Sequence, residues 1–220
     1  MSLLPSAFDP PPWLRSPHLQ SVLASSPLRA ARARRRLRDV AATHAATVLE
    51  VGGGVRLQGV ASRPAGVAPR ALALLLHGWE GSAESSYMRL TAARLLQAGF
   101  AVFRLDFRDH GGSHHLNEGL FHSNRLEEVV GAAQAVARRW PGLPLVAAGY
   151  SLGGNFALRL ALRAPAAGLP LLRVAAICPL LDPARTMDAM EAGPGFYMRY
   201  FEHKWRRSLA RKRALFPQAH

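Results

Sequence analysis

One serine stands at the centre of the pattern G-Y-S-L-G, which begins at Gly149 and ends at Gly153. The pattern lies between an apolar run at 145–150, typical of a buried strand, and a segment at 153–163 that is expected to be helical. A sharp strand-to-helix turn needs glycine on either side of the serine, because a β-carbon there would clash, and it exposes the hydroxyl at the carboxyl edge of the sheet. We therefore predict that Ser151 is a nucleophile, with Gly149 and Gly153 forming its turn. The alternative is a serine in an ordinary turn.

A second pattern, H-G-W-E-G-S, begins at His77 and follows another apolar run at 70–77. In sites of this kind, one amide that stabilises the oxyanion comes from the residue after the nucleophile and the other from this loop. The backbone N–H groups of Leu152 and Trp79 are therefore predicted to form an oxyanion hole, and Gly78 to let the backbone approach a substrate. His77 is predicted to be a loop-packing residue, the alternative role being that of general base.

The elements that must position these residues alternate between strand and helix. Strand-length apolar runs occupy 70–77, 100–106, 145–150 and 171–177, and segments of helical periodicity lie between them. Before them, β-branched runs at 47–51 and 55–62 are separated by three glycines, a pattern that favours a hairpin. We predict an α/β fold, in which a mostly parallel sheet with flanking helices is preceded by an antiparallel hairpin.

Several motifs in a fixed order resemble one family, the YheT-like α/β-hydrolases, which are related to the eukaryotic abhydrolase-domain proteins. They are P-H-L-Q from Pro17, the pattern from His77, F-R-D-H-G-G from Phe107, H-S before Asn124, and the serine turn from Gly149. Asp109 stands where the family more often has glycine. The resemblance implies an α/β-hydrolase fold and a serine esterase or lipase without a cofactor, acting on short- and medium-chain esters, monoacylglycerols or phospholipids.

A serine hydrolase also needs a histidine base and a carboxylate that orients it, in the chain order Ser, Asp or Glu, His. The candidates after Ser151 are Asp182, Asp188, Glu191, Glu202, His203 and His220. The D-x-x-x-P and H-G-G-H-x-G segments that carry these groups in the family are absent. We therefore expect a chain truncated after residue 220, with the acid and base beyond it; the alternative is that His203 or His220 has been recruited.

Other polar residues invite a metal site but do not match one. The cluster after the 100–106 run contains Asp106, Asp109, His110, His114, His115 and His122, without the spacing of a helical zinc site. We expect neither metal nor cofactor. Cys178 is the only cysteine, which excludes an internal disulfide, and its place at the end of an apolar strand predicts a buried thiol.

The domain organisation and the partners follow from composition and charge. We expect an extended arm and a short basic helix at 1–40, the α/β-hydrolase core at 41–180, and a helical lid-like region at 181–220. The formal net charge is +14, and six arginines crowd the stretch from Arg29 to Arg38. A basic amphipathic helix at 196–216 is expected to cover the pocket; the alternative is that it lies on anionic lipid.

No nucleic-acid-binding signature accompanies the arginines, so specific nucleic-acid recognition is not expected. The start of the chain has no secretory-signal pattern, which favours a cytoplasmic location. The alternative is a cytoplasmic protein in peripheral contact with an anionic membrane. The predicted reaction is hydrolysis of a small-molecule or lipid carboxylic ester through an acyl-serine. Two alternatives stay open: acyl transfer with the same residues, and a catalytically silent, basic binding module.

Overall fold

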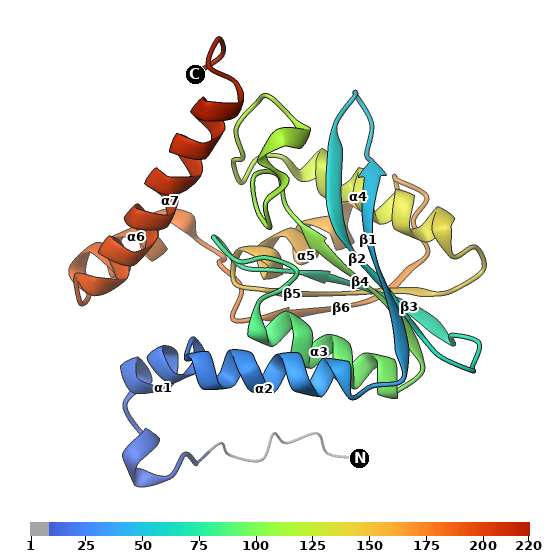
Figure 1. The fold of residues 1–220 in the computed structure, drawn as a ribbon, viewed down its shortest axis with the longest axis horizontal. Coiled ribbons are helices and arrows are strands. Elements are labelled where there is room, and N and C mark those ends of the chain that lie inside the picture. Colours follow the sequence, from blue (N-terminus) through green and yellow to red (C-terminus); the bar gives the residue numbers. More distant parts are fainter. Residues whose placement is uncertain (1–8) are drawn as a thin grey trace.

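Residues 9–220 are described by a computed structural model, in which one six-stranded sheet is flanked by helices (Figure 1). The first eight residues of the predicted arm lie outside the described range. The strands run in the order β1-β2-β4-β3-β5-β6 across the sheet. Their bounds are Ala42–Glu50 (β1), Arg56–Pro64 (β2), Ala71–Leu76 (β3), Phe100–Asp106 (β4), Leu145–Tyr150 (β5) and Leu171–Ile177 (β6).

The sheet is parallel from β4 to β6 and antiparallel at its other edge. β3 pairs in parallel with β4 and β5, and β5 pairs in parallel with β6. β1 and β2 form an antiparallel pair, and β2 also runs antiparallel to β4. The predicted mostly parallel sheet with an antiparallel hairpin is confirmed, and β4, β5 and β6 have the predicted bounds.

Side-chain alternation on β3 explains why helices cover both faces of the sheet. All six residues of β3 are buried, and successive side chains of a strand point to opposite faces. Leu72, Leu74 and Leu76 pack in one core cluster with α4 (Leu126–Arg139) and α5 (Leu152–Arg163). Ala73 and Leu75 pack in the other cluster with α2 (Pro27–Arg38) and α3 (Ser86–Gln97).

The described part of the N-terminal arm is more helical than predicted. A 3₁₀ turn, η1 (Pro12–Leu14), and a helix, α1 (Pro17–Ala24), precede the expected basic helix. Both α1 and α2 begin with proline after a serine whose side chain accepts a backbone N–H, Ser16 for α1 and Ser26 for α2. Serine at the cap with proline at the first helical position is a helix-start signal, so the prediction of an extended arm was wrong there.

The outer edge of β6 lacks a neighbouring strand within the described residues, and apolar side chains near it are exposed. Leu162, Leu172 and Ile177 are among the exposed large hydrophobic residues. Cys178, which directly follows β6, is exposed as well. The prediction of a buried thiol was wrong because an edge strand leaves its end uncovered on one side.

After β6 the chain forms α6 (Pro183–Ala192) and α7 (Phe196–Leu215), and α7 is attached to the loop that follows β4. The Lys212 ammonium donates to Asp109 Oδ1 at 2.6 Å, to the His114 carbonyl at 3.1 Å, and to the Asn117 carbonyl. The two charged side chains are almost fully buried, at 1% and 6% exposure. Since an unpaired buried charge is costly, this contact fixes α7 to the core.

We predict that Lys212→Met lowers the free energy of unfolding by about 3–5 kcal/mol, because the buried Asp109 carboxylate loses its cation. Urea denaturation at unchanged slope m measures the loss. Arg206→Met is the matched control on the same helix, since Arg206 pairs with Glu202 on the exposed surface and such pairs contribute less than about 1 kcal/mol. Equal effects of the two substitutions would contradict the anchoring role.

Candidate active site

Ser151 occupies a strained turn between β5 and α5. Its backbone has φ 52° and ψ −116°, in a region that residues other than glycine rarely adopt. A β-carbon on Gly149 would lie 2.0 Å from the Gly153 carbonyl oxygen, and one on Gly153 would lie 2.4 Å from the carbonyl oxygens of Leu76 and His77. The first turn of α5 therefore packs directly against β5 and the end of β3, which only glycine permits.

Backbone hydrogen bonds from the segment after β6 hold Ser151 in this turn. The Ser151 N–H donates to the Ile177 carbonyl at 3.0 Å, and the Leu180 N–H donates to the Ser151 carbonyl at 3.2 Å. The Asn155 side-chain amide, one turn along α5, donates to the Leu180 carbonyl at 2.8 Å. These hydrogen bonds hold Ser151 in its strained conformation, as a preorganised site requires.

The loop that begins at His77 lies against Ser151. A β-carbon on Gly78 would be 3.3 Å from the Ser151 β-carbon, so the absence of a side chain keeps the space beside the serine open. The Gly78 N–H is occupied, since it donates to the Tyr87 hydroxyl at 3.1 Å. Within residues 9–220, the N–H groups of Trp79 and Leu152 donate to no acceptor. Two unpaired amides, one next to the serine in the chain and one in the loop that faces it, suit a developing oxyanion.

His77 is fully buried, and both of its ring nitrogens are hydrogen-bonded. Nδ1 lies 2.7 Å from the Gly78 carbonyl oxygen and must donate to it, whereas Nε2 accepts the Phe107 N–H at 3.2 Å. Burial, with the nearby His110, lowers the pKa of His77 well below its usual value, so the ring is neutral. It joins the loop after β3 to the loop after β4, and neither nitrogen is free to take a proton from Ser151.

An apolar pocket of about 340 Å³ adjoins these loops. Trp79 and Leu152 line it together with side chains from the loop after β4 and from α6 and α7: among them are Leu120, Phe121, Met187, Trp205 and Leu209. The helical region at 181–220 thus contributes part of the pocket's lining. Because most of its lining is hydrocarbon, the pocket is suited to an apolar group.

Two residues of α7 hold the loop that begins at His77, and no local sequence pattern links either residue to this loop. Phe201 stacks on Trp79, with 4.9 Å between ring centroids and 4° between planes. The Lys204 ammonium donates to the Glu80 carbonyl at 2.7 Å. Glu80 itself has a positive φ of 54°. These contacts join residues more than a hundred positions apart, so only the fold brings them together.

The candidate acids and bases that follow Ser151 are engaged elsewhere or exposed. Asp182 caps α6 by accepting the Arg185 N–H, and Glu202 pairs with Arg206. His203 is exposed, and a ring nitrogen of His220 lies 3.0 Å from the Glu118 carbonyl oxygen. Among residues 9–220, no side chain forms a hydrogen bond with the Ser151 hydroxyl.

His110 and His114, in the loop after β4, face different partners instead of converging on one point. His110 Nδ1 lies 2.7 Å from the Arg108 carbonyl oxygen, and His114 Nε2 lies 2.8 Å from the Ser208 hydroxyl on α7. Burial lowers the pKa of His110 to about 4. The described range holds no group of three or more His, Cys, Asp or Glu side chains placed to bind a metal ion.

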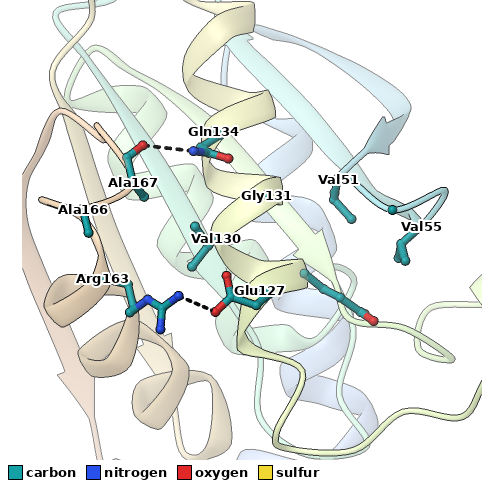
Figure 2. Close-up of a pocket in the computed structure, with 12 residues that line it drawn as sticks. Val51, Val55, Glu127, Val130, Gly131, Gln134, Arg163, Ala166 and Ala167 are labelled. Atoms are coloured by element: carbon teal, nitrogen blue, oxygen red, sulfur yellow. Dashed lines mark hydrogen bonds and ion pairs between the residues drawn. The ribbon is translucent and has the colours of Figure 1, made fainter.

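A second pocket, of about 530 Å³, is lined by other parts of the chain (Figure 2). It lies between α4, the end of α5 and the turn of the β1–β2 hairpin. Arg163 forms an ion pair with Glu127 at 2.7 Å across it, and Gln134 donates to the Ala167 carbonyl at 2.9 Å. These polar groups are already paired, and none of the predicted site residues lines this pocket.

Comparisons with known proteins agree with this architecture. Residues 67–216 match the Hydrolase_4 family, described as serine aminopeptidase, S33. A protein of Escherichia coli K12 with the name "Putative esterase YheT" is 27% identical over 145 residues, which are 66% of this chain and 42% of that protein. The chain thus spans less than half the length of this relative.

Solved esterase structures share the fold at low identity. Esterase Est22 has a TM-score of 0.59 at 19% identity, over 76% of this chain and 53% of that one. The Pyrococcus furiosus esterase Pf2001 has a TM-score of 0.58 at 20% identity, over 75% and 65%. Brefeldin A esterase has a TM-score of 0.52 at 22% identity, over 82% and 56%. These similarities show the α/β-hydrolase fold.

The buried histidines predict a loss of stability in mild acid. Since burial holds the pKa of His110 at about 4, against an ordinary value of 6.5, the unfolded chain binds a proton between these values that the folded chain does not. The contribution of neutral His110 to the free energy of unfolding is complete above about pH 6.5 and is lost as pH falls toward 4. Between about pH 7 and pH 5 we expect the free energy of unfolding to fall by about 2 kcal/mol from His110 alone.

Urea denaturation as a function of pH tests this expectation. His110→Gln keeps a donor for the Arg108 carbonyl and removes the titrating ring, so the fall should be smaller in this variant. His203→Gln serves as the control, because it removes an exposed histidine. A pH dependence as steep in His110→Gln as in the wild type would contradict the assignment.

Proposed function

The chain belongs to the Hydrolase_4 family (serine aminopeptidase, S33) and is a YheT-like α/β-hydrolase, and we propose that it hydrolyses carboxylic esters through an acyl-serine on Ser151. The observation that carries the proposal is the strained Ser151 turn with two unpaired amides, those of Trp79 and Leu152, beside it. The arrangement pairs a nucleophile with donors for the charge that develops during its attack.

The proposed reaction has two halves. In the first, the Ser151 oxygen adds to the ester carbonyl carbon, its proton passes to a general base, and the carbonyl oxygen becomes an oxyanion bound by the two amides. The bond to the alcohol oxygen then breaks, and the alcohol leaves with the proton from the base. In the second half, water adds to the acyl-serine, gives a proton to the base, and releases the carboxylic acid as the serine hydroxyl is restored.

The pocket supports an ester with an apolar acyl group. Its volume of about 340 Å³ lies at the small end of ligand pockets. Trp79 and Leu152, whose amides are the proposed oxyanion donors, also line this pocket, so an acyl chain in it would place its carbonyl near them. We propose short- to medium-chain acyl esters, including monoacylglycerol-like lipids, as the substrate class.

The general base is not assigned to any residue from 9 to 220. His77 uses both nitrogens in hydrogen bonds, and His220 contacts the Glu118 carbonyl. We propose that a histidine outside these 220 residues supplies the base, in keeping with the much greater length of YheT. The missing partner of Ser151 also supports a second candidate function, a catalytically silent binding module.

Exogenous imidazole tests the nucleophile and the missing base together. We predict slow turnover of p-nitrophenyl butyrate by the chain alone. Imidazole should raise the Ser151-dependent rate at least about tenfold, because general-base catalysis contributes about 10²- to 10⁴-fold. The rate is p-nitrophenol release by the wild type minus that by Ser151→Ala at the same imidazole concentration, which removes the direct reaction of imidazole with the ester.

Intact-mass spectrometry completes the experiment by detecting a butyryl adduct on the wild type and none on Ser151→Ala. The control Ser25→Ala removes an exposed serine at the end of α1 and should behave as the wild type does. A Ser151-dependent rate that imidazole does not change would place the base within the chain. No adduct and no Ser151-dependent rate would favour the binding module. Butyryl transfer to added alcohols would identify an acyltransferase.

A further inference from the structure

The N-terminal segment carries a large excess of positive charge. Between residues 10 and 38 the sequence has seven arginines and no Asp or Glu. Neither catalysis nor the core explains this composition, since only Ala33 and Leu37 of α2 are buried. Figure 1 shows α1 and α2 along one border of the molecule, on the outer side of α3.

Three of these arginines form a row that faces a fourth across a groove. Arg29, Arg32 and Arg36 are spaced by three and four residues, which places them along one side of α2. With Arg94 of α3 they line a groove of about 710 Å³ between the two helices. Within residues 9–220 none of the four forms an ion pair. Four unpaired guanidinium groups around one groove attract phosphate groups.

Exposed apolar side chains accompany the arginines. Leu28, which also lines the groove, is 83% exposed, and Trp13 of η1 and Val22 of α1 are 64% and 53% exposed. Arginine next to exposed tryptophan and aliphatic residues is the composition of segments that lie at a membrane interface. A groove for single-stranded nucleic acid would also offer aromatic rings for stacking, and no aromatic residue lines this groove.

The other basic element, α7, is less suited to a lipid surface. Phe201 and Leu209 face the protein, where Phe201 stacks on Trp79 and Leu209 lines the pocket, whereas Phe196, Tyr200, Trp205 and Leu215 are exposed. Several of its charges are engaged, as Lys204 binds the Glu80 carbonyl and Lys212 binds Asp109. None of the helices in residues 9–220 combines the length and apolar composition that crossing a bilayer requires.

We propose that the face formed by η1, α1, α2 and the Arg94 side of α3 docks on an anionic membrane. The arginines of the groove bind lipid phosphate groups, and Trp13, Val22 and Leu28 enter the interface beside them. The surface adjoins the helix over the pocket, because His18 Nδ1 of α1 lies 3.0 Å from the Tyr197 hydroxyl of α7. Docking in this orientation places the pocket-covering helix next to the source of a lipid substrate.

Co-sedimentation of the full chain with vesicles tests the proposal. We expect binding to vesicles in which about a third of the phosphatidylcholine is replaced by phosphatidylglycerol, weak binding to phosphatidylcholine alone, and weakening by salt. Arg29→Gln with Arg32→Gln and Arg36→Gln should lower the affinity for the anionic vesicles about a hundredfold, from the ordinary contribution of an arginine near a charged surface.

The matched control removes the same charge elsewhere. Arg207→Gln with Arg211→Gln and Arg213→Gln changes exposed residues of α7 and should lower the affinity by less than about threefold, since attraction is screened beyond a Debye length. Val22→Ser with Leu28→Ser should weaken binding several-fold. Unchanged thermal midpoints show that the variants are folded.

Three results would overturn the proposal. The first is binding that does not depend on anionic lipid, and the second is an equal loss in the two triple variants. The third is a loss of poly(U) binding in the α2 variant while its vesicle binding is unchanged, which would identify the groove as a nucleic-acid site. No loss in Val22→Ser with Leu28→Ser would overturn the entry of these side chains into the interface.

Discussion

The contact between the first turn of α5 and the end of β3 is the constraint on which the site depends. A β-carbon on Gly153 would fall 2.4 Å from two carbonyl oxygens of the β3 end, so the helix can start this close to the strand only with glycine there. This closeness forces Ser151 into its strained backbone and brings its side chain against Gly78. Ser151, the proposed nucleophile, and the loop that faces it are thus placed by one packing contact.

A neutral histidine, His77, connects the loop after β3 to the loop after β4. His77 donates from one nitrogen to its own loop and accepts at the other from the Phe107 N–H, just after β4. Protonation would convert the accepting nitrogen into a donor that faces another donor. Burial lowers the pKa of His77 and keeps its ring neutral. Because only the neutral ring can accept the Phe107 N–H, the contact between the loops after β3 and β4 depends on pH. His77 supports the loop that carries the proposed oxyanion donor, Trp79, and is not among the residues that line the pocket.

The sequence predicted those parts of the fold that rest on local patterns. Buried parallel strands are continuous apolar runs, so the bounds of β4, β5 and β6 could be read directly. The Ser151 turn was predictable because its glycines stand two residues away on either side. Helix α1 was missed although its Ser16-Pro17 start signal is local. The contacts of Phe201 with Trp79, and of Lys204 with Glu80, were beyond prediction, since each joins residues that only the folded topology brings together.

Asp109, which departs from the family pattern, makes structural contacts that glycine could not make. Its φ of 61° is the left-handed conformation that favours glycine, the residue more common in the family at this position. Aspartate is among the side chains that tolerate this conformation. Here its two oxygens bind the Lys212 ammonium at 2.6 Å and the Phe121 N–H at 2.9 Å. Glycine would satisfy the turn but leave Lys212 buried without a carboxylate, and Phe121 and α7 both line the pocket. In this chain, therefore, the residue that departs from the pattern joins the wall of the pocket to its roof.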